Sequence, residues 1–158
     1  MTCPTCRRGN DTDGDGNCPV CAKYARLKPS RIITAIRASL GPHLVKKNYL
    51  KLRPANATPS WGCCYVASEA LYHLWGKANG YTAMRLRYGL DPGNGELTGG
   101  MHWFLEQRAS GLQVDVTADQ FRGVPLDYEN ATPTGFLTKY PSKRAKIIID
   151  SVLEKISL

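Results

Sequence analysis

Two kinds of segment are missing from this 158-residue sequence. It contains no stretch of about 18 apolar residues that could cross a bilayer. It also does not open with a basic and then apolar segment that ends in a cleavage site. We therefore expect no membrane association and predict a soluble, cytoplasmic protein. The length suits one compact domain of ordinary size with a small appendage.

Acidic residues are scarce in the first third of the chain. Residues 1–55 contain eleven Lys and Arg against three Asp, so the formal net charge of +8 lies wholly there. Between positions 23 and 53, nine basic residues occur with no acidic residue among them: Lys23, Arg26, Lys28, Arg31, Arg37, Lys46, Lys47, Lys51 and Arg53. Such a segment can bind an anionic partner, and nucleic acid is one candidate. The alternative is an ordinary solvated surface.

Large apolar side chains are almost absent from residues 1–21, which contain instead two Cys-x2-Cys pairs, Cys3 with Cys6 and Cys18 with Cys21. Two close pairs joined by a short loop can surround one tetrahedral ion, so we predict a structural Zn²⁺ site. An iron ion with the same ligands fits the spacing equally. Two disulfides would require an oxidising compartment. Residues 1–28 are therefore predicted to form a zinc knuckle whose folding depends on its metal.

The remaining residues, 29–158, form the second predicted domain. Helical spacing of apolar residues predicts a helix with Ser30 as N-cap, a central helix from about residue 63 to Asn79, and a last helix capped by Ser142. Alternating residues predict strands over 82–88 and on both sides of a tight turn at Ser110 and Gly111. Residues 43–53 are ambiguous. This order of elements indicates an α+β fold.

Histidines are few, which narrows the choice of a general base for cysteine chemistry. Cys63 and Cys64 stand at the start of the central helix, where unpaired N–H groups favour a thiolate of lowered pKa. His73 lies too far along that helix to reach them, and His43 has no evident orienting partner. His102 is the remaining candidate.

The acid that would orient His102 lies on the next predicted strand. A two-residue turn at Ser110 and Gly111 places Asp119 opposite His102, whereas a bulge or a longer turn would favour Asp115. From hairpin geometry alone, the choice between the two carboxylates stays open.

These residues carry a resemblance to known cysteine enzymes. Gly62-Cys63-Cys64-Tyr65 resembles the Gly-x-Cys-aromatic start of the catalytic helix in papain-like peptidases, and "HWFLE" followed by "DVT" resembles the strand motifs of transglutaminase-like proteins. "GCCYV", "HW" and "DVTADQF" are more similar still to the patterns of small bacterial and phage proteins of the YunG-like type. The resemblance covers residues 56 to about 122.

The resemblance implies a papain/transglutaminase-like helix packed on a small antiparallel sheet. It implies Cys64 as nucleophile, His102 as general base and Asp115 as orienting acid. The backbone N–H of Cys64 would bind the oxyanion, with Asn56 as a candidate second donor. The expected activity is cysteine-dependent hydrolysis of an amide in a protein or peptide, by a peptidase, amidase or deamidase.

Four other interpretations stay open. Transglutaminase-like acyl transfer is less expected, because no site for a second amine is visible. The zinc knuckle and the basic segment could instead form a nucleic-acid or protein binding module with a degenerate triad. Cys64, His102 and Asp115 could also be a second metal site or buried structural residues. The glycine-rich residues 90–100 are predicted to act as a lid over the substrate.

Overall fold

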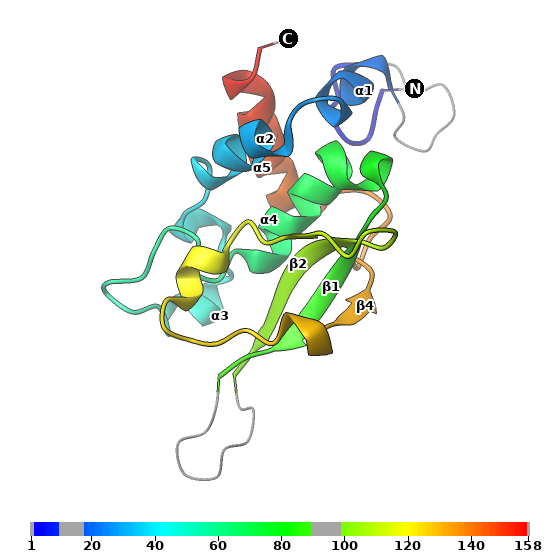
Figure 1. Ribbon diagram of the computed structural model, residues 1–158. Helices are drawn as coiled ribbons and strands as arrows, with labels where there is room; N and C mark the ends of the chain where they lie inside the picture. The colour runs from blue at the N-terminus through cyan, green and yellow to red at the C-terminus, as the bar shows by residue number, and fades with distance from the viewer. Residues whose placement is uncertain (1, 10–17, 90–98, 158) are drawn as a thin grey trace.

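The computed structural model describes residues 2–9, 18–89 and 99–157, and within these ranges it has the mixed α+β architecture that the sequence predicts (Figure 1). The α-helices are α1 (Pro19–Ala25), α2 (Pro29–Arg37), α3 (Lys47–Leu50), α4 (Cys64–Leu71) and α5 (Lys143–Lys155). The strands are β1 (Tyr81–Arg87), β2 (Met101–Gln107), β3 (Gln113–Val114) and β4 (Thr132–Thr134). They form one antiparallel sheet in the order β3-β2-β1-β4. None of the described helices is both long enough and apolar enough to span a membrane.

The predicted helix that follows the zinc knuckle begins earlier than expected. α2 starts at Pro29 with Lys28 as N-cap, so the prediction of Ser30 as N-cap is wrong. Proline suits the first helical position because its missing N–H would be unpaired there in any case. The predicted cap of α5 is confirmed, since Ser142 Oγ accepts a hydrogen bond from Ala145 N–H at 3.2 Å. The ambiguous residues 43–53 include a short 3₁₀ turn and α3.

The central helix is continuous but changes its winding. α4 is followed by a π-helical turn, η2 (Tyr72–Gly76), and a 3₁₀ turn, η3 (Lys77–Asn79). The helix ends at Gly80, whose φ of +75° is the left-handed conformation that glycine adopts without strain. The predicted span from residue 63 to Asn79 is therefore confirmed.

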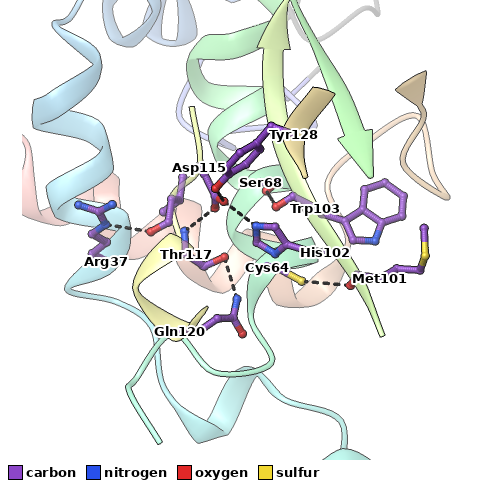
Figure 2. Close-up of polar contacts among 11 residues, drawn as sticks. Arg37, Cys64, Ser68, Met101, His102, Trp103, Asp115, Thr117, Gln120 and Tyr128 are labelled. Carbon is purple, nitrogen blue, oxygen red and sulfur yellow. Dashed lines mark hydrogen bonds and ion pairs between the residues drawn. The ribbon is translucent and has the colours of Figure 1, made fainter. Parts of the chain in front are cut away.

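The two faces of the sheet pack against different parts of the chain. α4 contacts one face, where Ala83 and Leu105 belong to the main hydrophobic core, and α2 and α5 pack against α4 (Figure 1). Ser68 Oγ on α4 donates a hydrogen bond to Trp103 O on β2 at 3.0 Å. The opposite face forms a second cluster around Phe104, which packs with Tyr128. β3 pairs only with Leu105 and Glu106, so the first residues of β2 have no partner on β3. They lie next to the first turn of α4 (Figure 2).

The hairpin between β2 and β3 differs from the prediction in its turn. Leu105 pairs with Val114, and Gln107 N–H donates to Leu112 O at 2.8 Å, so residues 108–111 form a four-residue loop. The expected two-residue turn at Ser110 and Gly111 is therefore wrong. The longer loop shifts the register by two residues and takes Asp119 out of line with His102.

The cysteine-containing segment docks on the body of the protein. Tyr24 OH donates to Ile156 O at 2.8 Å, and Arg8 donates to Leu153 O at 3.2 Å. Trp75 Nε1 donates to Leu27 O at 3.2 Å. The four cysteines and Tyr24 are continuous with the main hydrophobic core. The described residues 2–9 and 18–28 are thus attached to both the central helix and the last turn of α5, and the proposed boundary at residue 28 stays a prediction.

Candidate active site and metal centre

The four N-terminal cysteines form a cluster that can bind a metal ion. The Sγ atoms of Cys3, Cys6, Cys18 and Cys21 all lie within 4.8 Å of one another. Cys3 and Cys21 are 3.7 Å apart and Cys6 and Cys18 3.3 Å apart, too far for an S–S bond of about 2.05 Å. Four thiolates about 2.3 Å from a tetrahedral Zn²⁺ would be about 3.8 Å from one another. The predicted metal ligands therefore come together, and disulfides do not join them.

Cys64 is the first residue of α4, and Cys63 is its N-cap. Their thiols face different surroundings. Cys63 is fully buried, and its Sγ lies 3.7 Å from Gly41 O. Cys64 is half-buried, and its Sγ lies 3.8 Å from Met101 O at the start of β2 (Figure 2). Only Cys64 faces the strand that carries His102.

The expected low pKa of the Cys64 thiol is not found. Burial raises the pKa of Cys64 to about 11, because a thiolate loses solvation there. Backbone N–H groups at Trp103 and Tyr65 lower this pKa, and the negative charge of Asp115 raises it again. The donors at the helix N-terminus are therefore outweighed by desolvation, and the resting thiol is protonated at neutral pH. Burial also raises the pKa of Cys63.

His102 and Asp115 form a short, buried contact. His102 Nε2 lies 2.6 Å from Asp115 Oδ2, and the His102 side chain is fully buried. His102 Nδ1 is buried and has no hydrogen-bond partner in the described part of the chain. Figure 2 shows the imidazole ring between the Asp115 carboxylate and the Cys64 side chain. Phe121 packs edge-on against the ring at 4.4 Å between centroids.

Asp115 accepts two further hydrogen bonds, and only one of the two donors belongs to a sequence motif. Tyr128 OH donates to the same Oδ2 atom at 2.7 Å, and Thr117 N–H donates to Oδ1 at 3.1 Å. Burial and the Asp115 carboxylate raise the pKa of Tyr128. Thr117 belongs to the Asp-x-Thr motif, but Tyr128 begins the short 3₁₀ helix η5 (Tyr128–Asn130), which belongs to no motif, so only the tertiary structure identifies it.

Gln120 links the Asp115 segment to the loop before Cys64. Its Nε2 donates to Thr117 Oγ1 at 3.0 Å, and its Oε1 accepts from Gly62 N–H at 3.2 Å. Asp119, the alternative acid, accepts from Ser60 Oγ at 2.9 Å in the same loop. The segment that follows β3 therefore contains the Asp115 carboxylate and is also hydrogen-bonded to the turn that precedes Cys64.

Two other predicted site features, Asn56 and the lid, stay predictions. Asn56 is exposed, and no hydrogen bond among the described residues joins it to Cys64. Its oxyanion role stays a prediction. Nearly all of the proposed lid, residues 90–98, lies outside the described residues. Among the residues that the structure describes, the one group whose ligand atoms come close enough to hold a metal ion is the N-terminal cysteine cluster, and Cys64, His102 and Asp115 do not belong to it.

The predicted basic segment is largely exposed. Two of its arginines bind within the protein, since Arg37 donates to Val116 O at 2.8 Å and Arg53 donates to Ala57 O and Thr58 O at 3.3 Å. The other basic residues of the segment are all exposed: Lys23, Arg26, Lys28, Arg31, Lys46, Lys47 and Lys51. They stay candidates for binding an anionic partner.

Comparisons with protein-family models, curated proteins and solved structures find no match to this chain. The similarity to YunG-like, papain-like and transglutaminase-like proteins is therefore a resemblance of motifs alone.

Proposed function

We propose that this protein is a cysteine-dependent amide hydrolase of papain/transglutaminase-like architecture, with Cys64, His102 and Asp115 as its triad. The observation that carries the proposal is the contact between the buried His102 ring and Asp115. An ionised carboxylate can only accept, so His102 Nε2 donates to Asp115 Oδ2. Nδ1 has no partner among the described residues, on a ring that lies between Asp115 and Cys64, and in the neutral ring it would be free to accept a proton.

These positions suit general-base activation of the thiol at the moment of attack. His102 Nδ1 accepts the proton from Cys64 Sγ as the sulfur bonds to the substrate carbonyl carbon. Nδ1 then passes that proton to the leaving nitrogen as the C–N bond breaks, which leaves a thioester. Water gives a proton to Nδ1, its oxygen bonds to the acyl carbon, and the C–S bond breaks with return of the proton to Sγ. Asp115 stabilises the imidazolium formed in both steps.

The negative oxygen of the tetrahedral intermediate requires donors close to Cys64. The backbone N–H of Cys64, at the first position of α4, supports this role. Hydrolysis remains the preferred outcome over transglutaminase-like transfer, which would require a binding site for a second amine.

The N-terminal cluster is proposed to hold one structural Zn²⁺. Four thiolate ligands complete the tetrahedral coordination of zinc and leave no open position for a substrate, which is typical of structural sites. Bound zinc would crosslink the two Cys-x2-Cys pairs, and the knuckle would serve as a docking module for the substrate or a partner.

The test compares alkylation of Cys64 by iodoacetamide in the wild type and in His102→Ala at about pH 7. We expect the variant to react about a hundredfold more slowly, because it lacks the base. His43→Ala, which removes an exposed histidine, is the matched control and should react like the wild type. Equal rates in all three proteins would contradict the hydrolase and favour a binding module with a degenerate triad.

A further inference from the structure

Exposed basic residues lie on three elements that also carry residues of the candidate active site or their neighbours. The first is β1, where Arg87 is the register partner of Met101 on β2. Met101 O is the atom that lies 3.8 Å from Cys64 Sγ. Arg87 is exposed, so its charge lies at the end of the strand pair nearest the thiol.

The second element is the segment after η4 (Ala118–Phe121). Phe121 packs against the His102 ring, and exposed Arg122 follows it directly. The side chain of Asp119 in the same segment already accepts from Ser60 Oγ. Arg122 therefore adds a second exposed positive charge, one residue along the chain from the ring that packs on His102.

The third element is the region of α3. Val45 lies under the turn before the nucleophile, since a Cβ placed on Gly62 would come within 3.2 Å of its Cγ1 atom. Exposed Lys46 and Lys47 follow, and Lys51 comes one turn later. Among them, Tyr49 is 54% exposed and Leu52 is 71% exposed, so this basic surface also has apolar groups.

We infer that the substrate is an acidic polypeptide whose carboxylates bind Lys46, Lys47, Lys51, Arg87 and Arg122 around the scissile amide. The inference rests on the proposed hydrolase function. Exposed basic residues at the rim of the proposed site would attract a polyanionic substrate toward the thiol. Tyr49 and Leu52 offer contact area for apolar side chains of such a peptide. Nucleic acid has the same sign of charge, but its backbone offers no amide for Cys64 to attack.

The experiment measures how poly-L-glutamate protects Cys64 from iodoacetamide, a neutral reagent, at low salt and at about 0.5 M NaCl. We expect at least about tenfold protection at low salt and little at high salt, because salt screens exposed charges. The triple variant Lys46→Glu, Lys47→Glu, Lys51→Glu should lose the protection. The triple variant Lys23→Glu, Lys28→Glu, Arg31→Glu has the same net charge and should keep it. Arg122→Glu is a single-site alternative if the first variant does not fold.

The outcomes separate this inference from the hydrolase proposal. If unprotected labelling depends on His102 but poly-L-glutamate gives no protection, only the acidic substrate is overturned. If poly-L-glutamate protects while labelling is independent of His102, the acidic-polypeptide site stands and the hydrolase fails. Polyuridylate that protects as well at equal charge concentration would overturn the inference in favour of nucleic acid. Equal loss of protection in both triple variants would mean that net charge, not this rim, is responsible.

Discussion

At the scale of single residues, neighbours in the sequence occupy different chemical environments. Cys63 is the N-cap of α4 and Cys64 is its first helical residue, and only the Cys64 thiol faces β2. Cys63 Sγ is enclosed by the carbonyl oxygens of Gly41, Pro59 and Trp61. Cys64 retains access to solvent and to the strand that carries His102.

This difference leads to a prediction for the pH dependence of alkylation. The wild type should react faster than His102→Ala near neutral pH, and the two rates should converge as the pH approaches about 11, where the Cys64 thiol ionises without a base. Peptide mapping after iodoacetamide treatment should locate the label on Cys64 and leave fully buried Cys63 unmodified. Cys63→Ala is the control and should label normally. A constant fast rate below about pH 6 would show a preformed thiolate and contradict the raised pKa.

The Asp115 carboxylate supports a second prediction. Asp115→Asn should slow Cys64 alkylation at neutral pH by about a hundredfold, because an amide can donate to His102 Nε2 and so moves the ring proton to Nδ1. Tyr128→Phe removes the other donor to Oδ2 but leaves the His102 contact, so it should cost less than about tenfold. Thermal unfolding of each variant checks that the fold is retained. Equal losses in both variants would assign Asp115 a structural role only.

At the scale of secondary-structure elements, apolar periodicity was sufficient to predict the central helix, α5 and the β2–β3 hairpin. It could not predict contacts made across the fold. Glu69 is a charged residue in the central helix, yet it is fully buried because its carboxylate accepts from Ser142 N–H and Oγ–H at the start of α5. The length of the hairpin loop and the position of Tyr128 likewise depend on tertiary packing. The hairpin register could therefore not identify the acid that contacts His102, and the motif resemblance alone pointed to Asp115.

His73, in the π-helical turn η2, should make the free energy of unfolding depend on pH. Burial, and secondarily Lys77, lower the pKa of His73 to about 4, and its Nε2 is buried without a partner in the described residues. The unfolded chain binds a proton near the ordinary value of about 6.5, whereas the folded protein does so only near 4. The free energy of unfolding should therefore fall as the pH drops through this window.

The measurement is urea unfolding of the wild type and His73→Phe at about pH 7 and about pH 4.5. The variant should lose less stability between the two values, because it has no imidazole to protonate. His43→Phe, at an exposed position, is the matched control and should follow the wild type. An equal loss in His73→Phe and in the wild type would mean that other groups determine the acid sensitivity of this turn.

At the scale of the whole molecule, the cysteine cluster and the candidate active site lie at opposite ends of the central helix (Figure 1). Cys64 begins that helix, while α1 packs against η2 and η3 at its other end. A substrate or partner bound to the knuckle would therefore be anchored about one helix length, roughly 24 Å for sixteen residues, from the thiol. At this distance the cysteine cluster is too far from the thiol to take part directly in the proposed chemistry.

The last prediction concerns removal of the metal. The reduced protein should contain about one Zn²⁺ per chain, and chelation should unfold residues 2–25 because this segment has little core of its own. The bonds from Tyr24 to Ile156 and from Arg8 to Leu153 would then be lost. Hydrogen exchange should accelerate in the last turn of α5 but stay slow in α4 and β2, which are packed in the body. Cys6→Ser should reproduce the chelated state without any chelator. Faster exchange in β2 would show that the knuckle is needed to fold the body, and unchanged exchange in α5 would show that the two parts are independent.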